Sequence, residues 1–129
     1  MSSLNGKWIY RSFRPNSGAP PLVPWAPSGE LIVTTDATGQ VNGKLTFPSI
    51  KGLELTISGS VTAAVAGKLP EGVDLIGKGG LGSINKLQGY FINGSSGPLV
   101  VGTIVAEKSD PAKQPDGTSG PFVLFQANG

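Results

Sequence analysis

Three residues near the start of the chain alternate along one short stretch and carry groups suited to holding a ligand. Within "GKWIYRSF", residues 6–13, an indole, a phenol and an alcohol stand two positions apart, at Trp8, Tyr10 and Ser12. Side chains two apart in a strand point to the same face. That face would present an aromatic surface with two hydroxyls, which suits a small, mostly apolar ligand with a polar handle. The alternative is a small barrel whose interior these side chains simply fill.

Groups that could catalyse a reaction are few. The chain contains no histidine and no cysteine, so the commonest general base and the thiolate nucleophile are both missing. The remaining candidates for proton transfer are Tyr10 and Glu30, with Glu30 expected at a barrel mouth near Arg11 or Arg14. A cofactor-free enzyme of cyclase or isomerase type needs only a shaped cavity and one polar contact. We expect no cofactor and no metal site, since "SDPAKQPDG" lacks the spacing of a calcium loop.

The elements that position these residues read as strands throughout. No segment repeats its apolar residues with a helical period over three turns. Apolar or alternating runs bounded by turn residues predict eight strands, at residues 6–13, 29–35, 40–47, 53–65, 73–81, 84–92, 99–107 and 122–127. Eight short strands joined by hairpin-length turns predict an all-β fold. We expect an eight-stranded antiparallel up-and-down β-barrel, with a β-sandwich as the alternative.

Glycine inside the strands favours the barrel over the sandwich. The chain has 20 Gly in 129 residues, and five of them interrupt the predicted strands, at Gly43, Gly59, Gly77, Gly89 and Gly102. Glycine relieves crowding where the strands of a closed sheet bend sharply. The length fits one domain, residues 1–129, with a core of its own.

One segment departs from the strand pattern. Residues 14–28, "RPNSGAPPLVPWAPS", hold five prolines and one tryptophan, too Pro-rich for a central strand or a helix. A loop of this length in a compact domain is often a lid or a binding loop. Trp25 is expected to pack under the loop or plug the barrel end. Covering a ligand or sealing a subunit contact are its other possible roles.

The tripeptide Gly6-Lys7-Trp8 resembles the G-x-W of the calycin barrels, which include lipocalins, fatty-acid-binding proteins and avidins. The resemblance implies an up-and-down barrel with Trp8 closing one end. "GQVNGKLTF" resembles the third strand of avidins, and residues 87–125 resemble their carboxy-terminal half in the order of strands and loops. Tyr10 stands where avidins have asparagine, and "GTIVA" replaces their tryptophan-containing strand. The ligand expected from this resemblance is therefore not biotin. Lipocalins carry an arginine near the end of the chain that packs on the first tryptophan. Here no arginine follows Arg14, so the resemblance to lipocalins is weaker than that to avidins.

The outward faces of several strands predict a partner subunit. Alternation puts Ile9 and Phe13 outside, and the runs at 99–107 and 122–127 are apolar on both faces. Such strands need cover on both sides, so we expect a homodimer or homotetramer. The net charge of +2 comes from scattered residues, and we expect no nucleic-acid partner.

No apolar run approaches 18 residues, and the start "MSSLNGKW" has no signal-peptide core. We therefore expect no membrane partner and a cytoplasmic location, with secretion after signal removal as the alternative.

These observations predict a protein that binds a small molecule in the barrel cavity, without a cofactor. The residues expected to line the ligand are Trp8, Tyr10, Ser12 and Tyr90, with Trp25 on the covering loop. The first alternative is the cofactor-free isomerase or cyclase, acting through Tyr10 or Glu30. The second is a carbohydrate-binding module in which Trp25 is an exposed stacking ring.

Overall fold

The computed structural model describes residues 4–25, 27–80, 82–95, 97–108 and 115–126, and these form an all-β fold without helices. The strands are β1 (Gly6–Pro15), β2 (Leu22–Pro24), β3 (Gly29–Thr35), β4 (Gln40–Thr46), β5 (Glu54–Thr62), β6 (Gly72–Gly79), β7 (Ile84–Gly94), β8 (Gly97–Lys108) and β9 (Thr118–Gln126). The eight predicted strands are confirmed within a few residues at each end. Residues 81 and 127, the predicted ends of two strands, lie outside the described residues.

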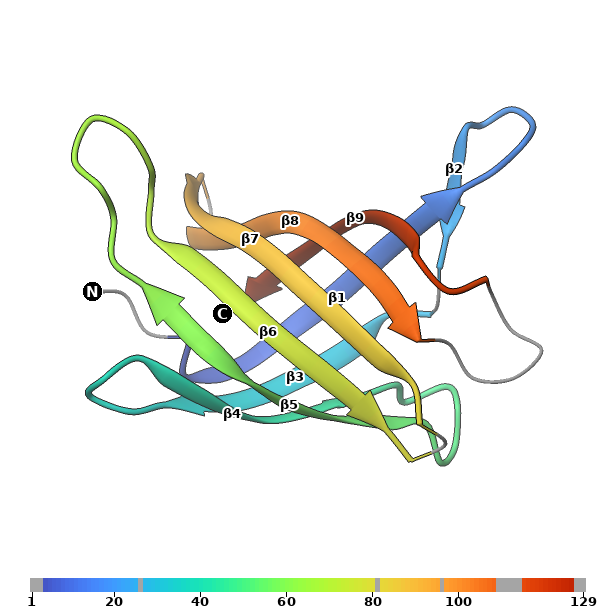
Figure 1. Ribbon diagram of the computed structural model, residues 1–129, viewed down its shortest axis with the longest axis horizontal. Helices are drawn as coiled ribbons and strands as arrows, with labels where there is room; N and C mark the ends of the chain where they lie inside the picture. Colours follow the sequence, from blue (N-terminus) through green and yellow to red (C-terminus); the bar gives the residue numbers. More distant parts are fainter. Residues whose placement is uncertain (1–3, 26, 81, 96, 109–114, 127–129) are drawn as a thin grey trace.

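Eight of the strands close into one antiparallel barrel (Figure 1). The hydrogen-bonded order is β1-β3-β4-β5-β6-β7-β8-β9, and β9 pairs with β1 to complete the ring. Each strand pairs with the next along the chain, so the connections are hairpins, apart from the detour through β2. The predicted up-and-down barrel is therefore confirmed, and the sandwich is excluded.

The β3–β4 hairpin illustrates how the sequence makes these turns. The Asp36 carboxylate accepts hydrogen bonds from the backbone amides of Thr38 and Gln40, at 2.9 and 3.0 Å. Gly39 takes a φ of 90°, a left-handed conformation that glycine adopts without strain. A hydrogen bond from the Thr38 hydroxyl to the Asp36 carboxylate, at 2.7 Å, is the main reason that the pKa of Asp36 lies below its usual value, and the Gln40 amide adds to the effect. The turn thus stabilises itself with its own side chains.

The barrel interior holds the hydrophobic core. Trp8 is buried near one end, where its indole Nε1 donates to the Leu4 carbonyl oxygen at 2.9 Å. Leu4 is itself fully buried. Inward residues from all eight strands complete the core, including Leu31, Val33, Val41, Leu45, Ile57, Val73, Leu75, Leu87, Val100, Ile104, Phe122 and Leu124. Side chains of the protein therefore fill the interior, as is usual for a barrel of eight strands.

Two of the strand glycines show why the strands carry them. A Cβ atom on Gly102 would lie 1.9 Å from the Gln88 carbonyl oxygen. A Cβ atom on Gly43 would lie 2.1 Å from the Ile32 carbonyl oxygen. At both positions the neighbouring backbone comes closer than any side chain permits. The expected relief of crowding is confirmed there.

The Pro-rich segment is a hairpin arm on the end of β1 (Figure 1). β1 continues to Pro15, and β2 pairs with its last residues, Arg14 opposite Val23. The strand β2 was not predicted, because its three residues, the last of them a proline, are too few to show an alternating pattern. Trp25 lies at the base of the arm, partly buried against the core, and its amide donates to the Ser12 carbonyl oxygen at 2.9 Å. Trp25 thus packs onto the barrel, and a lid role for residues 14–28 stays a prediction.

Candidate functional site

Three predicted ligand residues share the barrel interior. Trp8, Tyr10 and Ser12 are all buried on the inward face of β1, as their alternation predicts. The Tyr10 ring packs edge-on against Phe47, with ring centroids 6.1 Å apart, and stacks on Phe122 at 6.3 Å. Core side chains therefore surround Tyr10 on two sides. Whether any of the three contacts a ligand stays a prediction.

Burial controls the chemistry of Tyr10. It raises the pKa of the phenol to about 12, although a side-chain hydrogen bond with Ser12 acts in the opposite direction. A phenol with such a pKa keeps its proton at neutral pH. In that state Tyr10 can donate or accept a hydrogen bond, but it does not offer a ready phenolate base.

Glu30 lies on the outer side of the barrel wall. On β3 it follows Gly29, the residue opposite Tyr10, and its side chain pairs with the Lys7 ammonium at 3.3 Å. Alternation puts Lys7 on the opposite face from Tyr10. The two candidate catalytic residues are therefore not brought together, and Glu30 pairs with Lys7 rather than with Arg11 or Arg14.

Tyr90 also lies outside the barrel. Its side chain is 42% exposed, while the preceding Gly89 is buried. The expectation that Tyr90 lines the interior is thereby corrected. The reason is register, since Leu87 and Gly89 occupy the inward positions of β7 and Tyr90 takes the next outward one. Its ring still lines a depression, but on the outer surface.

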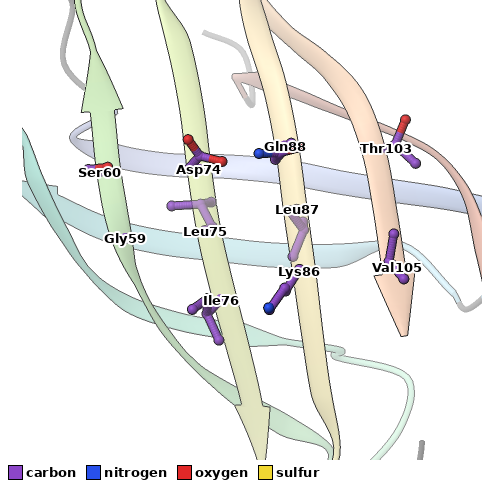
Figure 2. Close-up of a pocket in the computed structure, with 10 residues that line it drawn as sticks. All are labelled: Gly59, Ser60, Asp74, Leu75, Ile76, Lys86, Leu87, Gln88, Thr103 and Val105. Atoms are coloured by element: carbon purple, nitrogen blue, oxygen red, sulfur yellow. The ribbon is translucent and has the colours of Figure 1, made fainter. Parts of the chain in front are cut away.

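The outer wall formed by β5, β6, β7 and β8 carries a depression of about 590 Å³ (Figure 2). A volume of this size falls in the range of small-molecule sites. Its lining comes from four neighbouring strands and consists of Gly59, Ser60, Asp74, Leu75, Ile76, Lys86, Leu87, Gln88, Thr103 and Val105.

A row of polar side chains crosses this depression. Ser60 stands opposite Asp74, Asp74 opposite Gln88, and Gln88 opposite Thr103. Figure 2 shows the four residues at the same level on their four strands. Neighbouring strands lie about 4.8 Å apart, so the row spans about 14 Å. The row offers a carboxylate, a carboxamide and two hydroxyls on four successive strands of the barrel wall.

A second depression, of about 340 Å³, adjoins the first and shares Asp74, Gln88 and Thr103 with it. Leu69, Pro70 and Tyr90 border its far side. We call the two depressions together the outer groove. Gly72 stands opposite Tyr90 and is buried, because the Thr62 hydroxyl and the edge of the Tyr90 ring occupy the space beside it where a side chain would lie.

Charge in the outer groove is sparse. Lys86 is paired with Glu107, with the ammonium 2.6 Å from a carboxylate oxygen. The other charged residue of the lining is Asp74. Across the described part of the chain, no three acidic, histidine or cysteine residues cluster closely enough to hold a metal ion.

The outer groove is not predicted from the sequence. Asp74 and Gln88 each stand next to buried residues in their strands, so alternation could have marked them as outward-facing. The alignment of the four residues in the row depends on the register of three strand pairs, and the sequence does not reveal that register.

Apolar residues do face outward on neighbouring strands, as the sequence suggests. Two adjacent rows cross β7, β8 and β9, and the first reaches β1. The first row is Ile92, Leu99, Phe125 and Ile9, and the second is Tyr90, Val101 and Val123. No helix among the described residues covers them. The homodimer or homotetramer stays a prediction.

Within the residues that the structure describes, no helix has the length and hydropathy to cross a membrane.

Comparison with protein-family models, with curated proteins and with solved structures finds no match for this chain. The closed barrel agrees with a calycin-like architecture. A specific relationship to avidins stays a prediction. Fold alone does not define function, so the function has to be argued from the groups at the surface and in the interior.

Proposed function

We propose that this barrel is a binding protein whose ligand lies in the outer groove, on the wall formed by β5 to β8. The observation that carries the proposal is the row Ser60–Asp74–Gln88–Thr103, which crosses a depression of about 590 Å³. A few convergent polar groups in a concave surface are the usual features of a ligand site. The filled interior supports the same choice, because a ligand there would have to displace core side chains.

The surroundings of the two candidate catalytic residues, Tyr10 and Glu30, favour a binding function over catalysis. Tyr10 has a pKa of about 12 and packs between two phenylalanines. Glu30 is paired with Lys7 on the outer wall. A general acid or base works best with a pKa near the working pH and within reach of the reacting group. Tyr10 does not meet the first condition, and Glu30, paired with Lys7 on the outer wall, is not within reach of the barrel interior.

Binding inside the barrel is the second candidate, and one observation favours it. Arg14 follows Ser12 by two positions on β1, and its Nε atom is buried without a hydrogen-bond partner in the described part of the chain. Buried polar atoms in proteins are nearly always hydrogen-bonded, so an acceptor atom of a ligand is expected to bind Arg14 Nε. A carboxylate handle on a mostly apolar ligand would provide one, next to the hydroxyls of Tyr10 and Ser12. This is the cavity function that the sequence alone suggests.

A ligand-observed NMR screen distinguishes the two sites. The library combines sugars, amino acids, fatty acids and aromatic alcohols, and saturation transfer from the protein identifies the binders. Gln88→Trp fills the outer groove from an exposed position, and Ser12→Ala alters the interior. We expect the binders to be lost with Gln88→Trp and retained with Ser12→Ala. Loss with Ser12→Ala alone would support the interior site and contradict the proposal.

A further inference from the structure

We propose that the ligand of the outer groove is a neutral oligosaccharide, which lies along the polar row and stacks one sugar ring on Tyr90. This inference rests on the proposed function and adds the class of ligand. It follows from the kinds of group in the groove, from their spacing, and from the partners that the barrel architecture excludes.

The hydrogen-bonding groups suit vicinal hydroxyls. The Asp74 carboxylate accepts hydrogen bonds at two oxygens, and the Gln88 carboxamide both donates and accepts. These two side chains are direct neighbours across β6 and β7. A sugar hydroxyl is likewise both donor and acceptor, so a pair of adjacent hydroxyls can satisfy both side chains together. Ser60 and Thr103 extend the same pattern by one strand on each side.

The length of the row suits a short chain of sugars rather than one. Its four positions span about 14 Å across the strands. Neighbouring strands repeat at about the length of one pyranose unit, so successive sugars can meet successive side chains. A single small metabolite would use only part of the row.

Tyr90 provides an apolar surface beside the row. It stands two residues after Gln88 on β7, so its side chain leaves the same face about 7 Å further along the strand. Tyr90 is 42% exposed, and one edge of its ring lies over the buried Gly72, the residue opposite it on β6. The face of an aromatic ring carries partial negative charge and attracts the slightly positive C–H groups of a sugar. Leu69 and Pro70 border the same depression and extend the apolar contact.

Charge argues against anionic ligands. Asp74 would repel a phosphate or a sulfate near the centre of the row. The lysine of the groove, Lys86, is held by Glu107 at 2.6 Å and so does not offset that repulsion. A nucleic acid binds chiefly through several basic side chains on its phosphates. The groove lacks that pattern, so a nucleic acid or another polyanion does not match it, whereas the uncharged side chains of the row, Ser60, Gln88 and Thr103, suit a neutral ligand.

Closure of the barrel argues against a peptide. Extended peptides commonly bind by adding a strand to a free sheet edge. Each of β5, β6, β7 and β8 already has a hydrogen-bonded neighbour on both sides. Their backbone groups are therefore occupied, and a ligand has to bind through side chains alone. A polyhydroxyl ligand matches that requirement.

Isothermal titration calorimetry with defined hexasaccharides tests the inference. The neutral probes are the hexamers of β-1,4-glucose, α-1,4-glucose, β-1,3-glucose, β-1,4-xylose, β-1,4-mannose and N-acetylglucosamine, and a heparin hexasaccharide is the anionic probe. We expect at least one neutral probe to bind with a Kd of about 1 mM or tighter, and the heparin probe not to bind. No binding by any neutral probe, or binding of the heparin probe alone, would overturn the inference.

Substitutions in the outer groove test whether the saccharide binds there. Tyr90→Ala and Gln88→Ala should each weaken the binding of the neutral probe about tenfold, since both side chains are exposed and the fold should tolerate their loss. Thr34→Ala, on the outer face of β3, is the matched control and should bind like the wild type. Unchanged affinity in both groove variants would overturn the inference.

The two experiments distinguish a wrong ligand class from a wrong binding site. If the NMR screen finds binders of another class that Gln88→Trp abolishes, the site stands and the saccharide class is wrong. If a saccharide binds and neither groove variant changes its affinity, the site itself is wrong.

Discussion

Asp74 and Gln88 stand directly opposite each other on β6 and β7, on the outer side of a closed barrel. The pair lies at the centre of a polar row and is shared by both depressions of the outer groove. Cross-strand neighbours on one face have Cβ atoms about 5 Å apart, so a carboxylate and a carboxamide are presented as one unit. This relationship moves the expected binding surface from the inside of the barrel to its outside.

Tyr10→Phe should change how stability depends on alkaline pH. The pKa of Tyr10 is about 12 in the folded protein, against 10.0 for an ordinary tyrosine. As the pH rises, the unfolded chain loses this proton first, so the free energy of unfolding falls between about pH 10 and pH 12. The full shift corresponds to about 3 kcal/mol. Below pH 10 this contribution is fully present.

Urea unfolding measures this effect at about pH 9 and about pH 11.5. The wild type should lose more stability between the two pH values than Tyr10→Phe, because the variant has no phenol to ionise. Equal losses in the two proteins would show that burial of Tyr10 does not oppose its ionisation.

Gly102→Ala should destabilise the barrel strongly. The added Cβ would meet the Gln88 carbonyl oxygen at 1.9 Å, and that oxygen belongs to the backbone of the sheet, so it cannot turn aside as a flexible side chain could. Strand separation would have to increase locally, at a cost of about 3 kcal/mol in the free energy of unfolding. Gly80→Ala is the control, because a Cβ there has no neighbour within 4 Å. Urea unfolding of both variants is the measurement, and similar stability of the two would count against the close approach of β7 and β8.

Trp8→Phe should weaken the closed end of the barrel. The change removes the hydrogen bond from the indole Nε1 to the Leu4 carbonyl oxygen and leaves a cavity where the larger ring was packed. The combined loss should be about 2 to 4 kcal/mol. Thermal unfolding followed by circular dichroism would report it, and a melting temperature equal to that of the wild type would contradict the assigned role of Trp8.

Native mass spectrometry should reveal a dimer or a tetramer that depends on the first apolar row. Ile92 belongs to that row and is 41% exposed, so Ile92→Lys should leave the fold intact and dissociate the assembly. Ile50→Lys is the control, since Ile50 is 38% exposed in the connection between β4 and β5, and neither strand carries the row. A monomeric wild type, or an assembly that persists in Ile92→Lys, would contradict this interface.

The barrel fold could be predicted from the sequence because two local patterns, the alternation of apolar residues and the glycines within strands, both indicate it. Alternation put Trp8, Tyr10 and Ser12 inside, and glycines at positions such as Gly102 marked crowded strand crossings. Turn residues then fixed where each strand ends. Local patterns of this kind are read within one strand or one hairpin.

The binding surface could not be predicted in the same way. The outer groove depends on Ser60, Asp74, Gln88 and Thr103 lining up across four strands, which is a property of register between segments. The sequence alone suggests an inward Tyr90, because Gly89 beside it weakens the alternation along β7, whereas the structure places Tyr90 on the outer face. The sequence also does not show whether the barrel interior is a cavity or is filled. Phe47 and Phe122 pack against Tyr10, and contacts between residues so far apart in the sequence cannot be read from local patterns.

The central claim is that the ligand binds outside the barrel, and an amide chemical-shift map tests it most directly. Heteronuclear spectra of the ¹⁵N-labelled wild type would be recorded during titration with the neutral hexasaccharide that binds tightest. We predict that the largest shifts cluster on β5 to β8 around Asp74, Gln88 and Tyr90, while the amides of Tyr10 and Ser12 stay unchanged. Shifts centred on Tyr10, Ser12 and Trp25, with the outer wall unaffected, would contradict the account and return the site to the barrel interior.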